Sequence, residues 1–271
     1  MSYPRRPIAF VLAASDHGSM IVNRNDYRMN TPDEGVGVGY QIFEQSSFDP
    51  DEVGLALALL RRRRMHFGDG VVAVDGGANV GVHTIEWARC MHGWGKVFAF
   101  EAQEILFYAL AGNVALNNCL NARVRLAALG ERRGEMSVPQ PDYFSPASFG
   151  SLELRQHANN EFIGQPVSYE GGNTVPVVNL DALGLDRLDL VKLDVEGMEL
   201  EVLRGARDVL ARHRPILLVE VIKSDAAALE ALVTELGYRV FPIGINMLAV
   251  HASDPTLLQI RQLDNQLTLT A

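Results

Sequence analysis

The chain has 271 residues and is 48% hydrophobic and 21% charged, which is the composition of an ordinary soluble globular protein. Its length allows one large α/β domain or two small ones. The formal net charge is −9, and this charge argues against nucleic acid as the main partner, because binding to phosphates needs clustered cations.

Two cysteines, Cys90 and Cys119, are too few for a disulfide framework and cannot form a metal site alone. A reduced, cytoplasmic location is therefore expected. No stretch approaches the about 18 consecutive apolar residues of a membrane span. Residues 8–15 follow two arginines and faintly imitate a secretory signal, but we interpret this short apolar run as a buried strand.

Residues 1–66 are predicted to form an N-terminal cap or lid segment that contains one helix. Loop signals, many of them glycines, dominate its middle. Asp49 and Pro50 then mark a helix start, with Glu52 in the first turn. The basic run at residues 61–64 is interpreted as the solvated end of this helix, where cations suit the helix dipole.

Residues 71–84 form the motif around which the chain is organised. An apolar, β-branched run ends at Asp75, a turn containing Gly76, Gly77 and Gly81 follows, and a helical pattern begins. A strand, a tight turn and a helix N-terminus in this order bind nucleotides, because glycines let a ligand approach the backbone and the helix offers free N–H groups.

Two cofactor classes use such a turn. A dinucleotide site needs the pattern G-x-G-x-x-G, and Ala78 replaces its second glycine here. An S-adenosylmethionine site needs an acid at the strand tip and a loop of small residues, and Asp75 suits a ligand that carries an ammonium and a sulfonium group. A turn that binds no ligand stays open as a third interpretation.

The second predicted strand, residues 96–101, also stops at an acid, Glu101. An acid about 25 residues beyond the glycines commonly holds the two ribose hydroxyls of an adenosine, and a solvated glutamate at the strand end is the alternative. A helix at residues 105–120 and a third strand at residues 124–129 follow. Residues 131–173 break the alternation, and we expect an irregular insertion with short strands over the mouth of the site.

The alternation resumes with a fourth strand at residues 188–194, which ends in Asp194 and turns through Glu196 into a helix. A fifth strand at residues 216–221 carries Glu220 near its end. Open parallel sheets bind ligands at the carboxyl ends of their strands, so these acids should converge with the earlier ones.

Ser224 is predicted to cap the next helix. The last two strands, residues 238–241 and 247–250, are too close in sequence for a crossover helix and should pair antiparallel. Residues 252–271 begin with an Asp-Pro pair and are predicted to form a C-terminal helix, which would be a dimer contact. The whole pattern predicts an α/β fold with a mostly parallel sheet, helices on both faces and one reversed strand at the end.

Four segments resemble those of a known family: Asp75-Gly76-Gly77-Ala78-Asn79-Val80-Gly81, Phe100-Glu101, Lys192-Leu193-Asp194-Val195-Glu196-Gly197-Met198-Glu199 and Asn246-Met247-Leu248-Ala249. The chain is similar to the FkbM-type methyltransferases, which belong to the seven-stranded, Rossmann-like, S-adenosylmethionine-dependent class I. The octet is the most specific of these segments. The similarity implies a methyltransferase domain at residues 67–251. One departure is that the family often has Glu-Pro after the second strand, where this chain has Glu101 and Ala102.

The resemblance implies roles for the residues around the glycine turn. Asp75 should lie near the methionine ammonium of S-adenosylmethionine, and Glu101 should bind the ribose. His83, in the first turn of the following helix, is expected beside the cofactor or at the surface, and a role as catalytic base is the alternative. The residues expected at the cofactor are Asp75, Gly76, Gly77, Ala78, Asn79, Gly81, His83, Glu101 and Ala102.

The residues expected to act in catalysis are Lys192, Asp194, Glu196 and Glu220. One carboxylate would serve as general base, or Asp194 and Glu220 would bind Mg²⁺ that acidifies the acceptor hydroxyl. The positions of these two acids resemble those of the metal ligands in catechol-type O-methyltransferases. The metal-independent version is preferred, because the sequence lacks further clear oxygen ligands. The alternative for Glu196 and Glu199 is that they only favour the N-terminus of the next helix.

The predicted function is therefore O-methylation of a hydroxyl on a small molecule, a sugar or a secondary metabolite, by an enzyme that forms a homodimer and binds no nucleic acid. An NAD(P)-dependent oxidoreductase is one rival, and Ala78, Asp75 and the terminal hairpin count against it. A non-catalytic binding protein with a methyltransferase fold is the other rival. The intact acids Asp75, Glu101 and Asp194 count against that rival.

Overall fold

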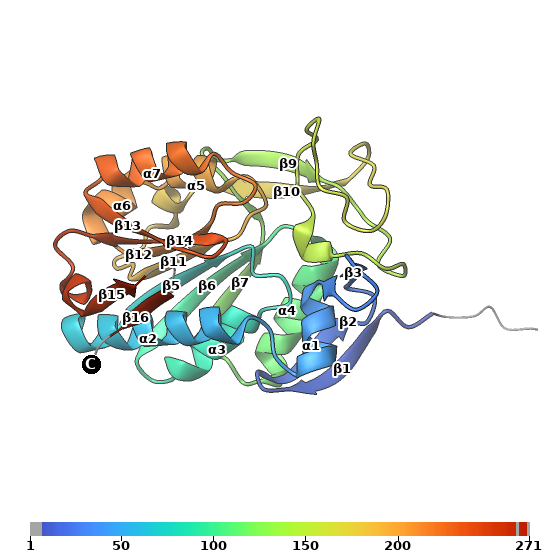
Figure 1. The fold of residues 1–271 in the computed structure, drawn as a ribbon, viewed down its shortest axis with the longest axis horizontal. Helices are drawn as coiled ribbons and strands as arrows, with labels where there is room; N and C mark the ends of the chain where they lie inside the picture. Colours follow the sequence, from blue (N-terminus) through green and yellow to red (C-terminus); the bar gives the residue numbers. More distant parts are fainter. Residues whose placement is uncertain (1–6, 264–265, 270–271) are drawn as a thin grey trace, which may run out of the picture.

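A seven-stranded sheet forms the centre of the protein (Figure 1) in the computed structural model, which describes residues 7–263 and 266–269. In spatial order its strands are β13 (Tyr238–Ile243), β14 (Asn246–His251), β12 (Ile216–Glu220), β11 (Leu190–Leu193), β5 (Val71–Gly76), β6 (Gly95–Glu101) and β7 (Ala122–Leu126). Strands β7, β6, β5, β11 and β12 pair in parallel, and β14 runs antiparallel to both β12 and β13. The predicted mostly parallel sheet is confirmed, and its reversed strand lies second from the edge.

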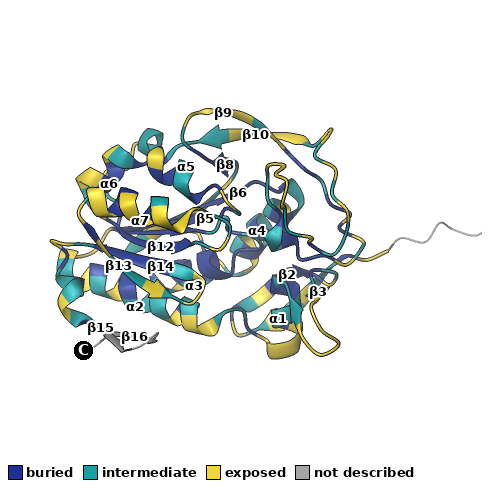
Figure 2. Cartoon of the chain, turned by 45° about the horizontal axis from the view of Figure 1, so that its top comes forward, coloured by how far each residue is buried: buried dark blue, intermediate teal, exposed yellow. Residues whose placement is uncertain are grey.

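The central strands are buried on both faces (Figure 2), which is why their sequences are nearly continuous apolar runs. Alternate residues of β5 enter different cores: Val71 and Ala73 pack on one side of the sheet, and Val72 and Val74 pack on the other. The first core contains side chains of α2 (Pro50–Phe67), α3 (Val82–Cys90) and α4 (Glu104–Leu116). The second contains side chains of α5 (Glu199–Arg204), α6 (Arg207–His213) and α7 (Ala226–Glu235).

Two helix details differ from the prediction. The helix after β11 is broken into α5 and α6 at Gly205, where an added Cβ would lie 2.6 Å from the carbonyl oxygens of Gly130 and Glu131. Helix α7 is capped by Asp225, whose side chain accepts from the backbone N–H of Ala228. The predicted cap was one residue earlier.

The N-terminal segment forms a hairpin of β1 (Phe10–Ser15) and β2 (Gly18–Asn23), a short pair of β3 (Arg28–Met29) and β4 (Gly35–Val36), and helix α1 (Val38–Gln45). The prediction of a buried first strand is wrong, because Leu12 is 64% exposed and alternate residues of β1 face solvent. The other strand of the hairpin packs on α4, where Asn113 hydrogen-bonds the backbone of Ile21. Helix α1 lies where glycines indicated a loop, and Gly39 is needed because a Cβ there would lie 2.5 Å from the carbonyl oxygen of Asn23.

The basic run at residues 61–64 is not simply the solvated end of α2. Arg63 is 5% exposed and forms ion pairs with Asp189, at 3.1 Å, and with Asp254. Its guanidinium also lies over the ring of Phe67. Because α2 packs against the sheet, one of its four consecutive arginines must face the core, where both carboxylates compensate its charge.

Residues 131–173 form mostly irregular structure beside a second small sheet. That sheet contains β8 (Ala128–Leu129), β10 (Asn173–Val178) and β9 (Gly134–Val138), and a short helical turn, η1 (Phe149–Ser151), follows in the irregular part. The insertion is held to the N-terminal segment by buried Asp26, whose carboxylate accepts from the backbone N–H groups of Gly39 and Phe149. Two segments more than 100 residues apart in sequence therefore pack as one wall.

Over the described residues, the predicted C-terminal helix at residues 252–271 is wrong, and residues 264–265 and 270–271 of that prediction lie outside them. A short helical turn, η3 (Pro255–Gln259), follows β14, as the turn η2 (Leu180–Leu183) follows β10 earlier in the chain. The chain then continues into β15 (Ile260–Leu263), which pairs antiparallel with β16 (Gln266–Leu269). The Asp-Pro start caps only this short turn, since Asp254 accepts from the backbone N–H of Thr256 and uses its other oxygen for Arg63. The sequence holds two strand-like runs here, at residues 260–263 and 266–269. The homodimer stays a prediction.

Within the described residues, no helix combines the length and the apolar character that crossing a membrane would need.

Candidate active site

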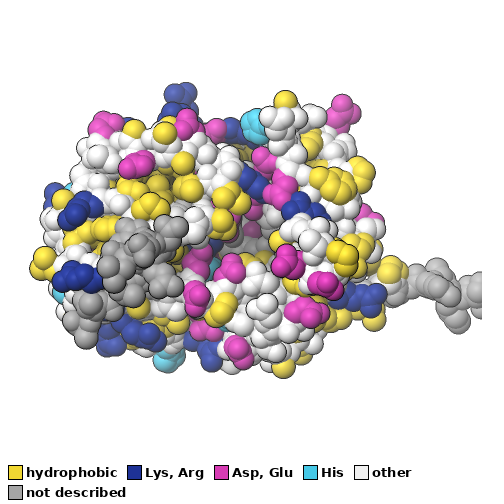
Figure 3. Space-filling view, viewed as in Figure 1, with side chains coloured by type: hydrophobic (Ala, Val, Ile, Leu, Met, Phe, Trp, Pro, Cys, Tyr) yellow, Lys and Arg dark blue, Asp and Glu magenta, His cyan; other side chains and the backbone are white. Residues whose placement is uncertain are grey.

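A cavity of about 310 Å³ opens at the carboxyl ends of β5, β6, β11 and β12. The strand-end loops, the N-terminal segment, the insertion and the turn before β14 all contribute to its lining. Figure 3 shows a hollow on this face, with acidic side chains around it. This is the end of a parallel sheet at which ligands bind.

The glycine turn after β5 forms the floor of this cavity. Gly77 has φ +79°, and a Cβ built on it would lie 1.8 Å from the carbonyl oxygen of Asp194. The turn therefore packs directly on the loop after β11, and only glycine permits this contact. Every predicted cofactor residue lines the cavity except Gly76, which packs beneath it between Leu129 and Leu193.

Asp75 is 1% exposed and lies at the carboxyl end of β5. One of its oxygens accepts a hydrogen bond from the Thr84 hydroxyl at 2.5 Å, and the other has no partner among the described residues. A buried carboxylate oxygen without a partner is costly, and a donor from a bound ligand would satisfy it. The acid thus fits a ligand with an ammonium group.

Glu101 is also buried, at 6% exposure, so the alternative of a solvated strand-end glutamate is wrong. Its two oxygens accept from the backbone N–H groups of Asn79, at 2.8 Å, and Gln103, at 2.7 Å. Burial raises the pKa of Glu101 to about 7, although these hydrogen bonds act in the opposite direction. The carboxylate ties the glycine turn to the loop after β6 and leaves lone pairs for a ligand.

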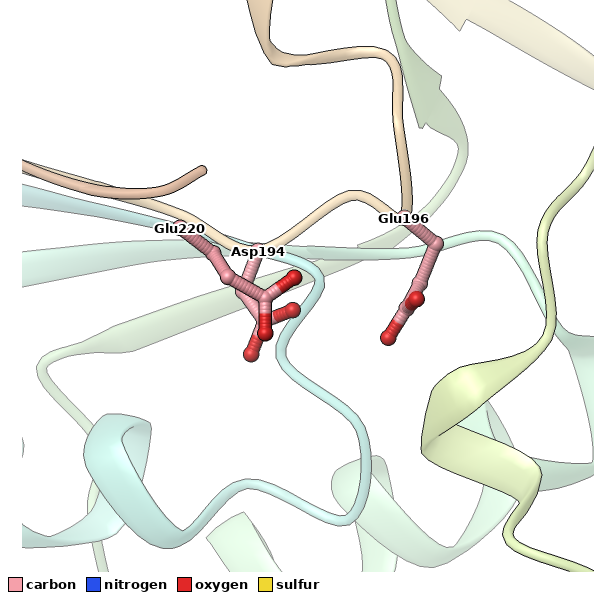
Figure 4. A group of neighbouring side chains, drawn as sticks. All are labelled: Asp194, Glu196 and Glu220. Atoms are coloured by element: carbon pink, nitrogen blue, oxygen red, sulfur yellow. The ribbon is translucent and has the colours of Figure 1, made fainter. Parts of the chain in front are cut away.

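Three carboxylates from two adjacent strand ends meet beside this turn (Figure 4). Asp194, Glu196 and Glu220 each place an oxygen within 4.8 Å of the other two. Burial raises the pKa of Glu220 to about 8, and the nearby Asp194 adds to the shift. Burial and Asp194 likewise raise the pKa of Glu196 well above its usual range. The sequence prediction that these acids converge is confirmed.

Two lysines compensate part of this negative charge. Lys192 Nζ lies 3.0 Å from Asp194 Oδ2, and Lys223 Nζ lies 2.5 Å from Glu196 Oε2. Burial lowers the pKa of Lys192, but the carboxylates around it outweigh this effect and raise the pKa above its usual value. Lys192 therefore stays charged, and it holds Asp194 in place.

Sequence reasoning missed Glu52, which it placed only in the first turn of a helix. Glu52 lines the cavity, with Oε1 3.0 Å from His83 Nε2 and 3.8 Å from Lys192 Nζ. Its other oxygen accepts from Asn246 Nδ2 at 2.6 Å. Burial acts to raise the pKa of Glu52, but its contacts with His83 and Lys192 outweigh this and lower the pKa to about 2. His83 itself is buried beside the cavity, so the surface alternative is wrong.

Lys223 was also missed, because no motif surrounds it. Besides Glu196, it contacts Glu161 of the insertion at 2.8 Å and donates to the carbonyl oxygen of Ser151. Arg28 contacts the same glutamate at 2.7 Å. An ionic chain thus crosses one side of the cavity from the N-terminal segment to the loop after β11.

Glu199, the last acid of the octet, has a structural role. Its carboxylate accepts from the backbone N–H groups of Val195 and Gly197 and from the Ser224 hydroxyl. It does not line the cavity. The acid fixes the turn that carries Glu196, which has φ +56°.

Glu220 has no hydrogen-bond or ion-pair partner among the described residues, and this gives a testable expectation. Between the ordinary pKa of about 4.5 and the folded-state value of about 8, the unfolded chain is ionised and the folded chain is protonated. The folded state therefore binds more protons, and its stability falls as pH rises through this window. Glu220→Gln should remove that loss, so its thermal midpoint should exceed that of the wild type increasingly from pH 6 to pH 9.

Melting curves across this pH range check the expectation, with Glu235→Gln as the control. Glu235 is an exposed acid of α7 that pairs with Arg207 outside the cavity. Parallel pH profiles for the wild type and Glu220→Gln would show that Glu220 is not an uncompensated acid.

Several known proteins are similar to this chain. The family profile described as "Methyltransferase FkbM domain" matches residues 75–240. The chain is 32% identical to methyltransferase sdnD of Sordaria araneosa over 156 residues, which are 49% of this chain and 59% of that protein. It is 28% identical to methyltransferase 1 of Beauveria bassiana over 186 residues, which are 64% of this chain and 74% of that protein.

Among solved structures, the crystal structure of methyltransferase FkbM from Methylobacillus flagellatus is similar with a TM-score of 0.45 and 17% identity. The similarity covers 70% of this chain and 48% of that one. The chain thus spans about half of that solved structure and 59% of the Sordaria protein. The profile match alone covers more than half of the chain, so this protein belongs to the FkbM methyltransferase family.

Proposed function

We propose that the protein is an S-adenosylmethionine-dependent O-methyltransferase that acts on a hydroxyl of a small molecule, a sugar or a secondary metabolite. The observation that carries the proposal is one cavity in which acids at four strand ends, three of them buried, meet a glycine turn. When bound, S-adenosylmethionine supplies an electrophilic methyl group, and the electron pair of its broken carbon–sulfur bond stays on sulfur. The side chains described above supply binding, orientation and proton transfer.

The order of the strands supports a proposal for which end of the cavity holds the cofactor and which holds the acceptor. Glu101 ends β6, Asp75 lies near the end of β5, Asp194 follows β11 and Glu220 ends β12, and these four strands are neighbours in that order. Glu101 would hold the ribose and Asp75 the methionine ammonium. The acceptor would then lie over β11 and β12, beside the carboxylate cluster.

The chain's own chemistry at the acceptor end is proton transfer. A hydroxyl becomes a better nucleophile as its proton leaves, so a carboxylate within reach assists the transfer. Asp194 is held by Lys192, and Glu220 has no partner among the described residues, so both can face an acceptor hydroxyl. Orientation by the cavity walls adds to this effect.

A divalent cation is the alternative to an unassisted carboxylate base. Asp194, Glu196 and Glu220 are oxygen ligands of the type that Mg²⁺ prefers. However, Lys192 and Lys223 already place positive charge against two of the three acids. This compensation favours the metal-independent version.

The two rival functions receive less support from the site. A nicotinamide cofactor would place its pyrophosphate at the glycine turn, where Asp75 and Glu101 present buried acids instead. A non-catalytic binding protein would have no need for carboxylates held close together at a cost in free energy.

The test is isothermal titration with S-adenosylhomocysteine and with NAD. We expect heat of binding with S-adenosylhomocysteine and none with NAD, because the turn lacks the second glycine of a dinucleotide site and carries Asp75. The reverse result would reject the proposal. Radioactive methyl transfer to a panel of hydroxyl acceptors then tests the reaction itself.

Glu101→Ala should weaken S-adenosylhomocysteine binding by about 1–3 kcal/mol, the range for losing hydrogen bonds to a charged group. Unlike a solvated strand-end acid, this residue should also matter without cofactor, because two backbone N–H groups lose their acceptor. Chemical denaturation of the cofactor-free protein measures the second effect, and titration measures the first. Unchanged affinity in a folded variant would remove Glu101 from the cofactor site.

A further inference from the structure

We infer that the end of the cavity over β11 and β12 selects its acceptor by charge. It takes an acceptor that is neutral, or that carries a protonated amine beside the reacting hydroxyl, and it rejects one that carries a carboxylate or phosphate there. This end of the cavity selects an acceptor only if the proposed methyl transfer is correct. The titrations described below distinguish failure of this inference from failure of the proposed function.

The first observation is the charge of the cavity lining. Among its described lining residues, carboxyl side chains outnumber lysine and arginine side chains by eight to three. Burial raises the pKa of three of the eight, Glu101, Glu196 and Glu220, most strongly, and the other five still outnumber the three cations. Such an excess inside a concave site produces a negative potential, because low-dielectric walls concentrate the field. A ligand that brings positive charge is favoured there, and an anion is repelled.

The second observation is that each of the three cationic side chains already has a carboxylate partner. Lys192 pairs with Asp194, Lys223 pairs with Glu196 and Glu161, and Arg28 pairs with Glu161. An anionic group on an acceptor would have to break one of these ion pairs to gain a partner. Breaking such a partly buried pair leaves its carboxylate without compensation, which is unfavourable.

The third observation concerns Glu220, which feels the positive charges of Lys192 and Lys223 but pairs with neither. It is 9% exposed, and it makes no hydrogen bond or ion pair with the described residues. Figure 4 shows its carboxylate pointing into the same gap as that of Asp194. A buried carboxylate beside another one needs a proton or a cation, and an ammonium group of the ligand can supply it.

Apolar side chains beside the three carboxylates indicate that the part of the acceptor away from its hydroxyl is apolar. Ile222 and Ile245 line the cavity and are 56% and 52% exposed. Their loops are joined by a hydrogen bond from the Val221 N–H to the Ile245 carbonyl oxygen. An apolar part of the acceptor can cover these two side chains while its hydroxyl reaches the carboxylates.

The negative charge at this end of the cavity also suits methyl transfer to an oxygen. Positive charge develops on the acceptor oxygen as it forms the new bond to carbon, before its proton has left. Carboxylates beside that oxygen stabilise this charge in the transition state more than in the ground state.

The experiment compares S-adenosylhomocysteine with sinefungin by isothermal titration of the full chain. Sinefungin carries an ammonium-bearing carbon where S-adenosylmethionine has its methylated sulfur, so the two probes differ mainly in charge at that point. We expect sinefungin to bind at least about tenfold more tightly to the wild type, as a nearby opposite charge allows. The preference should fall to about threefold or less in Glu220→Gln.

Two further variants complete this comparison. Glu235→Gln, outside the cavity, should keep the full preference for sinefungin. Glu196→Gln should reduce this preference, and it replaces Glu220→Gln in the comparison if that variant does not fold. Equal affinity for both probes in the wild type, or an unchanged preference in both cavity variants, overturns the inference. Binding of neither probe instead rejects the proposed function.

A second measurement addresses the acceptor itself in the presence of saturating S-adenosylhomocysteine. Tyramine, tyrosol and 4-hydroxyphenylacetate share one phenol ring and differ in having a positive, neutral or negative end. We expect 4-hydroxyphenylacetate to bind most weakly, and its tightest binding would overturn the inference. If none of the three binds, the comparison of sinefungin with S-adenosylhomocysteine decides alone.

Discussion

Replacing Asp194 by asparagine is expected to lower kcat by about 10²- to 10⁴-fold, the range for losing a general base. The affinity for S-adenosylhomocysteine should change by less than about threefold, because the cofactor is assigned to Glu101 and Asp75 on the neighbouring strands. Asparagine has nearly the shape of aspartate but cannot accept the hydroxyl proton. Lys192 would keep Glu52 as its partner, at 3.8 Å, so the local structure should survive.

Chelation separates the two chemical versions of this site. If the carboxylate acts without a metal, EDTA should leave the wild-type rate unchanged while Asp194→Asn remains impaired. If a divalent cation bridges Asp194, Glu196 and Glu220, EDTA should reproduce the loss seen in the variant. Steady-state turnover of both proteins, with and without chelator, distinguishes these outcomes.

Asp51→Asn is the matched control, since Asp51 is an exposed acid in the first turn of α2 and does not line the cavity. It should keep wild-type turnover under all conditions. Full activity in Asp194→Asn would remove this residue from the mechanism, and the proton would then have to pass to Glu220 or to solvent.

The sheet and the acids at the carboxyl ends of its strands were predictable, because the sequence patterns that indicate them are local and periodic. Each central strand is an apolar run that stops at or next to an acid, and each run is separated from the next by a helical pattern. Parallel pairing then brings all the strand ends to one edge. Asp75, Glu101, Asp194 and Glu220 could therefore be placed together before any contact was known.

The rest of the site could not be predicted, because it depends on pairings between distant segments. Glu52 contacts His83, Lys192 and Asn246, yet its sequence context is fully explained by a helix start. Lys223 and Arg28 acquire their roles only through Glu161 of the insertion. No local pattern carries that information.

The wrong predictions have the same origin. Nothing in the run of four arginines shows that Arg63 will find Asp189 and Asp254 in the core. The Asp-Pro start of the C-terminal segment is equally suited to a long helix and to one short turn. The segment after this turn forms strand β15 because it pairs with β16, and a helix-start motif gives no information about strand pairing.

Gly77→Ala should destabilise the fold by more than about 4 kcal/mol, a loss that only a few mechanisms produce. A positive φ alone costs a residue with a Cβ about 1–2 kcal/mol. At Gly77 the new Cβ would also lie 1.8 Å from the carbonyl oxygen of Asp194. This atom belongs to the backbone, so no side-chain rotation can relieve the contact.

Gly93→Ala is the matched control, because Gly93 has the same φ of +79° but no atom within 4 Å of an added Cβ. Chemical denaturation should show only the backbone cost of about 1–2 kcal/mol there, with S-adenosylhomocysteine binding intact. In Gly77→Ala, relief of the contact must separate the glycine turn from the loop that carries Asp194, so binding and turnover should be lost together. Equal stability losses in both variants, with binding retained, would mean that the turn does not pack on that loop and does not form the floor of the cofactor site.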